Sequence, residues 1–222
     1  VFFSVTLLVA AILENTTLVI VAVILVMCVI VKKSNKESNK LTESANKTSV
    51  EKAESYRMDL RIYGTYNNKG INKIIMVNNY KNTDKDISIT VDGKEEKYLV
   101  KDNKKYKVEN EKLSSAENVP FTNTEVYLDG VSKIKNLKEE KEQKIGKNTY
   151  KVYKGTISIN DMTSILKESD ISIKTDKDIE TEVWLTSDNY VYKVYYKLDK
   201  LTIYASYFGY GNMNKVNLDM YK

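Results

Sequence analysis

The sequence of 222 residues predicts a mainly β domain of the α+β class, preceded by one apolar membrane segment. Residues 1–31 carry a single formal charge, at Glu14. From Ser55 onward, apolar and polar residues alternate in several separate runs, as is typical of half-buried strands. Strand and helix patterns do not alternate repeatedly, and the turns between strands are short. The strands are therefore expected to form an antiparallel meander.

The N-terminal segment predicts a transmembrane anchor over residues 1–31. Residues 18–31 have no polar face at any helical period, so apolar atoms must surround them. A bilayer core of about 30 Å needs roughly 20 helical residues, which residues 12–31 supply. The protein is expected to span the cell membrane once.

Two other interpretations of this segment stay open. A cleaved signal peptide would need a small-residue site, but no Ala-x-Ala pattern follows Val31. A lipoprotein would be acylated at Cys28, and Leu25-Val-Met-Cys28 resembles the start of a lipobox. Met27, however, stands where Gly, Ala or Ser is usual.

The next residues divide into a polar stalk, 32–50, and a β-rich domain, 51–222. The stalk is expected to bury almost nothing because it is rich in Lys, Asn, Ser and Glu. In the domain, Asp92-Gly93 between alternating runs is a hairpin signal. The first strands are predicted at Ser55–Ile62, Ile71–Tyr80, Ile87–Val91, Glu96–Val100 and Lys105–Glu109, with a turn at Asn67–Gly70.

The middle of the chain predicts a mixture of elements. Pro120 marks a loop, and Gly130 interrupts a short helix within 124–137. Asn160 is expected to cap a helix over 161–169 that buries Met162, Ile165 and Leu166. The other predictions are an exposed strand or loop at 138–145 and strands at 148–158, 179–186, 190–198, 201–208 and near 216–218.

The C-terminal half resembles LolA/LppX-like bacterial lipoproteins. The similar features are Gly146-Lys-Asn-Thr-Tyr150, a strand, a short helix, Glu182-Val-Trp-Leu185, Ser187-Asp-Asn, Val191-Tyr-Lys-Val194 and Tyr204-Ala-Ser-Tyr-Phe-Gly209. The resemblance implies a strongly curved antiparallel half-barrel, closed by short helices, that holds an acyl chain or another hydrophobic ligand. It also implies an extracytoplasmic domain, whereas the lysines at 32, 33, 36 and 40 favour a cytoplasmic one by the positive-inside rule.

Strand alternation gives the residues expected to line such a ligand site. Several strands offer one apolar face, and the sequence has few long helices to cover it. The alternative is that the same residues simply form the core. The candidates are Met58, Leu60, Ile62, Met76, Ile89, Val183, Leu185, Val194, Tyr196 and Ile203.

A second candidate surface comes from the unusual number of tyrosines, 17 in all. Alternation on 190–198 places Tyr192, Val194, Tyr196 and Leu198 on one face and Lys193, Tyr195 and Lys197 on the other. With Tyr204 and Tyr207, the lysine face is an alternative binding surface for a cell-wall polymer, another glycan or a protein.

Composition excludes several classes of function. Histidine is absent, so Ser-His catalysis has no general base. Cys28 is the only cysteine, so a zinc site lacks its usual ligands. No Gly-rich phosphate loop occurs. Arg57 and Arg61 are the only arginines, and a net charge of +5 is low for nucleic-acid binding. No enzyme activity, catalytic residue, metal or cofactor is expected; the expected partners are the membrane and a lipid.

Overall fold

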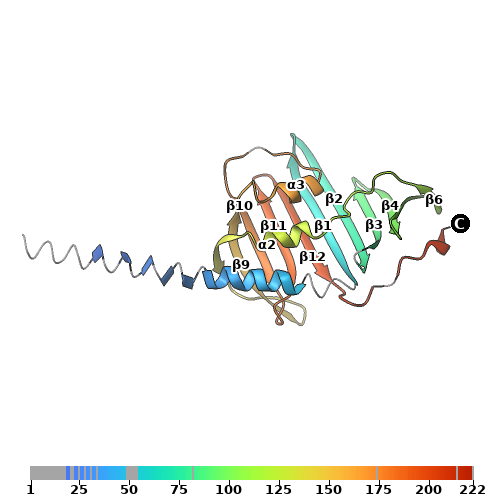
Figure 1. The fold of residues 1–222 in the computed structure, drawn as a ribbon. Helices are drawn as coiled ribbons and strands as arrows, with labels where there is room; N and C mark the ends of the chain where they lie inside the picture. The colour runs from blue at the N-terminus through green and yellow to red at the C-terminus, as the bar shows by residue number, and fades with distance from the viewer. Residues whose placement is uncertain are drawn as a thin grey trace, which may run out of the picture.

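One antiparallel sheet dominates the computed structural model (Figure 1). The structure describes residues 19–20, 23–24, 26–27, 29–30, 32–33, 35–48, 55–81, 83–173, 175–213 and 215–221. The strands are β1 (Ser55–Tyr66), β2 (Lys69–Tyr80), β3 (Asp84–Val91), β4 (Lys94–Lys101), β5 (Lys104–Glu109), β6 (Lys112–Ser115), β7 (Lys135–Glu139), β8 (Gln143–Ile145), β9 (Asn148–Ile157), β10 (Ile179–Leu185), β11 (Val191–Leu198) and β12 (Leu201–Phe208).

The sheet order joins the two ends of the domain at its centre. It runs β6-β5-β4-β3-β2-β1-β12-β11-β10-β9-β7, with β8 paired to β9. Neighbouring strands follow one another in the chain except β1, which pairs with β12, and β7, which pairs with β9; β9 and β10 are connected through α3. The predicted meander is therefore confirmed, and the β1–β12 pairing makes the two halves one continuous sheet.

Left-handed turn residues fix the hairpin register. Asn67 and Asn68 have φ of 50° and 60°, and Asp92 and Gly93 have φ of 49° and 81°. Two successive residues with positive φ match the right-handed twist of the adjoining strands. Asn, Asp and Gly adopt this conformation at little cost, which explains why both hairpins turn at these residues.

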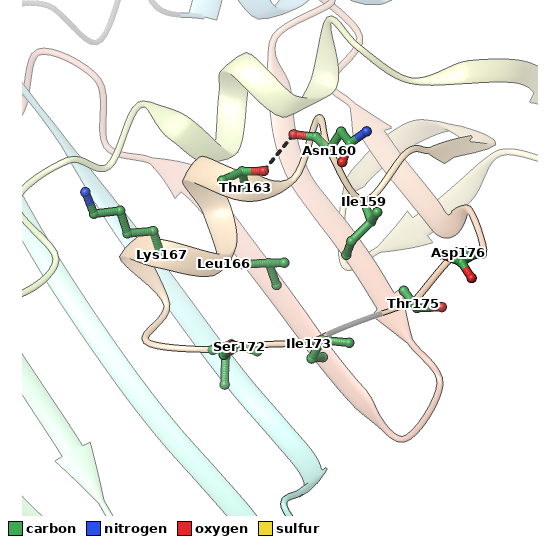
Figure 2. Close-up of a pocket in the computed structure, with 10 residues that line it drawn as sticks. Ile159, Asn160, Thr163, Leu166, Lys167, Ser172, Ile173, Thr175 and Asp176 are labelled. Atoms are coloured by element: carbon green, nitrogen blue, oxygen red, sulfur yellow. Dashed lines mark hydrogen bonds between the residues drawn. The ribbon is translucent and has the colours of Figure 1, made fainter.

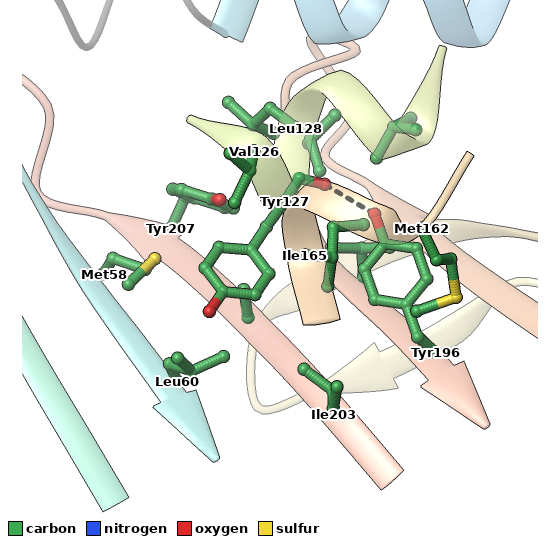
Figure 3. Close-up of a cluster of buried hydrophobic side chains, with 14 of the residues drawn as sticks. Met58, Leu60, Val126, Tyr127, Leu128, Met162, Ile165, Tyr196, Ile203 and Tyr207 are labelled. Carbon is green, nitrogen blue, oxygen red and sulfur yellow. Dashed lines mark hydrogen bonds between the residues drawn. The ribbon is translucent and has the colours of Figure 1, made fainter. Parts of the chain in front are cut away.

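Two short helices and the helical residues 35–48 lie on the same side of the sheet (Figure 1). The short helices are α2 (Val126–Val131) and α3 (Thr163–Glu168). We call the side they occupy the covered face and the other side the open face. The main core lies between the covered face and these helices (Figure 3).

The prediction that residues 32–50 bury almost nothing is wrong. Leu41 and Ala45 are buried in the core, and the Thr48 hydroxyl accepts a 2.7 Å hydrogen bond from the Val191 amide. Lys47 Nζ donates to the Asp188 carbonyl at 2.9 Å and lies 4.1 Å from the Tyr190 ring centroid. Apolar residues spaced four apart are enough to dock one helix face although the segment is mostly polar.

Three smaller predictions also need correction. Helix α3 begins at Thr163 rather than Asp161, and its N-cap is Met162, although Met162, Ile165 and Leu166 are buried as expected. Residues 218–220 form a 3-10 helix, η1 (Leu218–Met220), instead of a strand near 216–218. The segment 138–145 contributes the end of β7 and all of β8.

The predicted membrane span is only partly among the described residues, and Cys28 lies outside them. Within the part of the chain that the structure describes, no helix has both the length and the apolar character needed to cross a bilayer. Eight large apolar side chains are exposed there, at Val19, Ile20, Val23, Ile24, Val26, Met27, Val29 and Ile30.

Candidate ligand-binding face

Nine of the ten predicted lining residues share the covered face. On the central strands Met58 pairs with Tyr207, Ile62 with Ile203 and Val183 with Val194, so alternate residues of each strand point to the same side. The nine are Met58, Leu60, Ile62, Ile89, Val183, Leu185, Val194, Tyr196 and Ile203, and all are buried.

Met76 lies on the opposite side of the sheet. It pairs with Asp59 on β1 and Ser88 on β3, whose side chains face away from the core. The Arg57 guanidinium donates from Nη2 to the Met76 sulfur at 2.9 Å. The prediction was wrong because Met76 falls out of step with Ile75 and Val77, the two buried residues that flank it.

Buried tyrosines fasten α2 to the covered face. The Tyr196 hydroxyl donates to the Tyr127 carbonyl at 2.6 Å (Figure 3), and the Tyr207 hydroxyl donates to the Thr124 carbonyl at 3.1 Å. Tyr56 shares a hydrogen bond with the Thr124 hydroxyl. Each bond satisfies a polar group that burial would otherwise leave unpaired.

The packing of α2 also depends on Gly130. A Cβ atom at this position would lie 2.4 Å from the Tyr196 hydroxyl and 2.7 Å from Cδ1 of Ile165. The helix therefore approaches β11 and α3 more closely than a residue with a side chain would allow. The Tyr127 and Ser169 hydroxyls, 3.1 Å apart, link α2 to the end of α3.

Burial sets the protonation of these tyrosines. It raises the pKa of the Tyr127, Tyr196 and Tyr207 hydroxyls well above the ordinary value of 10.0, and the pKa of Tyr56 rises for the same reason. All four stay protonated at neutral pH. They can therefore donate their hydrogen bonds, but they cannot act as acid–base groups there.

An opening beside the covered face leads toward Ile89. This pocket of about 400 Å³ lies between the strands β2–β4 and the loop around Pro120. Its apolar lining comprises Ile89, Val91, Val119, Pro120 and Phe121, and its rim carries Lys73, Glu96, Lys167, Glu168 and Asp170. The Lys73 ammonium lies 3.5 Å from the Asp170 carboxylate across this rim. The pocket thus joins an apolar floor to a charged edge.

A second pocket, of about 600 Å³, lies on the other side of α3 (Figure 2). Ile159, Leu166 and Ile173 supply its apolar lining, with Asn160, Thr163 and Asp176 around them. The Ser172 amide donates to the Tyr66 hydroxyl at 2.9 Å, which ties the segment after α3 to the end of β1. Openings therefore lie on both sides of α3.

The rim of the pocket at Ile89 carries ionisable side chains in a partly buried setting. Burial raises the pKa of Glu168 at the rim, although the Asn123 amide donates to it at 3.0 Å. Among the described residues, no group of three or more His, Cys, Asp or Glu side chains is placed to hold a metal ion.

The predicted tyrosine and lysine surface is only partly as expected. Lys193, Tyr195, Lys197 and Tyr204 do lie together on the open face, where Tyr195 pairs with Tyr204. Tyr207, by contrast, is buried on the covered face. Sequence reasoning missed Tyr63, Tyr150 and Trp184, although Tyr63 and Trp184 follow the same alternation as their polar neighbours.

Tyr192 also lies on the open face, because the register shifts between Trp184 and Leu185 on β10. Trp184 pairs with Lys193 and Leu185 with Val191, so Tyr192 is an extra residue on β11. Such a bulge lets two successive residues point to one side. Tyr192 consequently stacks on Tyr150, with ring centroids 4.4 Å apart, and not beside Val194 as alternation predicted.

Comparison with known proteins identifies the architecture. No family model and no curated protein matches the chain. Several solved structures do match, among them two mycobacterial proteins. The lipoprotein LppX of Mycobacterium tuberculosis is 15% identical over 80% of this chain and 98% of its own, with a TM-score of 0.55. LprF of Mycobacterium bovis is 13% identical over 83% of this chain and 98% of its own, with a TM-score of 0.59.

The chain has a LolA/LppX-like fold. The resemblance predicted from the C-terminal half is thereby confirmed, and it extends over most of the domain. At these identities the likeness concerns the fold alone, so the ligand has to be inferred from the residues of this chain.

Proposed function

We propose that this protein is a membrane-attached, extracytoplasmic binding protein that takes the acyl chain of a lipid between its covered face and α3. The observation that carries the proposal is the apolar pocket at Ile89, Val91 and Phe121, which opens onto the core of a LolA/LppX-like sheet. The lining supports an apolar ligand, and the charged rim supports a polar headgroup at the entrance.

The short helices α2 and α3 provide a route to the buried lining residues. Helices α2 and α3 have six residues each, and neither has a side-chain hydrogen bond at its N-cap. Isolated helices of this length are unstable, so their position depends on packing against the sheet. An acyl chain that enters at Ile89 would replace apolar contacts of α3 by similar contacts of its own. The lining predicted from the sequence would then form the inner part of the site.

Membrane attachment rests on the exposed apolar side chains between residues 19 and 30. A helix surface of this kind is stable when lipid surrounds it. Digestion of intact cells by an added protease would test the location. Loss of the domain while a cytoplasmic marker survives is expected, and full protection of the domain would contradict the extracytoplasmic location.

Photo-crosslinking tests the ligand site in the full chain. The protein is reconstituted in liposomes that contain a phospholipid with a photoreactive group at the end of one acyl chain, and labelled peptides are mapped by mass spectrometry. Label is expected on the peptides that carry Ile89 and Phe121. Native mass spectrometry followed by solvent extraction should also find a lipid that copurifies.

A matched pair of variants makes this test specific. Val91→Asp places a charge in the pocket, whereas Ile145→Asp makes the same kind of change at an exposed apolar residue of β8 that lies outside it. Val91→Asp should lose most of the label, since an unpaired carboxylate opposes an apolar chain. The proposal fails if label stays near residues 19–30 alone, or if both variants label like the parent protein.

A further inference from the structure

Six aromatic rings form a strip across five strands of the open face. Tyr150 on β9 stacks on Tyr192 at 4.4 Å and lies 5.9 Å from Trp184 on β10. On β11 and β12, Tyr195 lies 5.1 Å from Tyr204, whose ring in turn lies 6.1 Å from Tyr63 on β1. We call Tyr63, Tyr150, Trp184, Tyr192, Tyr195 and Tyr204 the ring strip. At about 4.8 Å per strand it is roughly 19 Å long.

Lys193 lies at the middle of the ring strip. Its ammonium is 5.3 to 5.6 Å from the ring centroids of Tyr192, Trp184, Tyr204 and Tyr195. Four rings around one cation make a favourable cation–π site. Because the protein's own lysine occupies it, the strip has no such site left for a cationic ligand.

The charges at the strip favour an anion. Glu182 accepts hydrogen bonds from the Trp184 indole at 2.7 Å and from Lys197 at 3.0 Å, and Asp59 pairs with Arg57 at 2.7 Å. Within the described residues, neither Lys193 nor Arg61 has a carboxylate within salt-bridge distance. Burial lowers the pKa of Lys193, and repulsion by the nearby Arg61 charge lowers it further. Glu182 attracts the Lys193 charge from a distance, but among the described residues neither cation forms an ion pair beside the rings.

The shape of the strip favours a flat ligand. None of the pockets described above is lined by a residue of the ring strip, whereas the anchoring side chain of a protein partner usually fills a pocket. Its rings are fixed on strands rather than on loops, and Tyr63 at one end is exposed. A rigid, shallow aromatic surface suits groups that stack. The face of a sugar ring is such a group, because its C–H hydrogens carry a partial positive charge and the face of an aromatic ring carries a partial negative charge.

We propose that the ring strip, together with Arg61 and Lys193, binds an anionic polysaccharide. Tyr150 is buried and supports Tyr192 from below, so the sugar rings lie over the other five rings, and the acidic groups of the polymer pair with Arg61 and Lys193. This surface is on the opposite side of the sheet from the lipid pocket, so a failure of one proposal does not affect the other.

Trp184 provides a direct measurement, because it is the only tryptophan in the chain. Polygalacturonate, a polymer of a sugar acid, is titrated into the full chain in detergent micelles while the indole emission is followed. Dextran supplies sugar without charge, and polyglutamate supplies carboxylates without sugar. A saturable change with polygalacturonate alone is expected, and it should weaken as salt is raised to about 0.5 M.

Three variants locate the contact. Lys193→Gln and Arg61→Gln should each weaken binding about fivefold, and Tyr63→Ala by a similar factor, as for partly exposed ionic and stacking contacts. Lys144→Gln, an equal loss of charge at an exposed lysine of β8, should change the affinity less than twofold.

Several results would overturn this proposal. If polyglutamate binds equally well, the ligand is an acidic polypeptide or any polyanion. If dextran binds equally well, the ligand is a neutral glycan. No response to any polymer, or parental affinity in both Lys193→Gln and Arg61→Gln, would make the strip a structural feature only. Circular dichroism of each variant separates lost binding from lost folding.

Discussion

The two faces of β11 carry the same residue type in different settings. Tyr196 is fully buried on the covered face, and its hydroxyl donates to the Tyr127 carbonyl. Its neighbour Tyr195 is half-buried among the rings of the open face, where burial raises the pKa to about 12. One tyrosine therefore holds a helix in place, while the other contributes to a surface that a partner can reach.

The difference shows that strand alternation separates two environments in one sheet. Side chains of the covered face lose water to the helices and contribute mainly to stability. Most rings of the open face, Tyr195 among them, keep part of their exposure, so their removal costs less; Tyr150 is the buried exception. Stability measurements on pairs of residues from the two faces test this separation directly.

The largest contrast is expected between Tyr196→Ala and Tyr195→Ala. Tyr196→Ala should lower the free energy of unfolding by about 3 to 5 kcal/mol, because it empties a core position and removes a buried hydrogen bond. Tyr195→Ala should cost about 1.5 kcal/mol or less, mainly its contacts with neighbouring rings. Urea unfolding of the full chain in mild detergent measures both. Equal losses would mean that the open face is part of the core.

The covered face is expected to extend to the helical residues 35–48. Leu41→Ala should cost about 2 to 4 kcal/mol, since Leu41 is 0% exposed and its truncation leaves a cavity. Asn46→Ala, an exposed position on the same helix, is the control and should change stability by less than about 0.5 kcal/mol. If both variants unfold like the parent, this helix does not belong to the domain.

Alkaline pH should affect the covered face through its buried tyrosines. Their folded-state pKa values are raised, so above pH 10 the unfolded chain releases protons that the folded chain retains. Stability is therefore complete below pH 10 and falls above it, by roughly 1.4 kcal/mol per pH unit for each such tyrosine. In Tyr196→Phe, the free energy of unfolding should fall less steeply above pH 10, by the contribution of one tyrosine, about 1.4 kcal/mol per pH unit. An unchanged slope would show that Tyr196 ionises normally in the fold.

The smallest effect concerns a charge pair on the open face. Lys197→Gln breaks its contact with Glu182 but should cost less than about 1 kcal/mol, because Lys197 remains 42% exposed. Lys144→Gln is again the control in chemical denaturation. A loss above about 2 kcal/mol would indicate a buried network that the exposure of Lys197 does not suggest.

Local patterns explain how much of the fold was predictable. Alternation located most of the strands, and Asn67-Asn68 and Asp92-Gly93 placed their turns, because side-chain period and backbone preference act between near neighbours. The same alternation found nine of ten covered-face residues. It failed at Met76, because the four consecutive apolar residues 74–77 do not reveal which of them point inward.

Other features depend on distant parts of the chain. The bulge at Trp184 and Leu185 turns Tyr192 to the open face, and it exists only because β10 and β11 pair in that register. The docking of residues 35–48 depends on β9 to β11, which follow more than a hundred residues later. Such contacts leave little trace in a local pattern of polar and apolar residues.

The sequence by itself determined most of the strands, several of their turns, the apolar N-terminal run and the division of most strands into an apolar and a polar side. These properties follow from the conformational and solvation preferences of neighbouring residues. Only the tertiary structure decided that α2, α3 and residues 35–48 cover one side and that four rings surround Lys193 on the other. The pairing of β1 with β12 brings these residues together from opposite ends of the domain, and no local rule specifies that pairing.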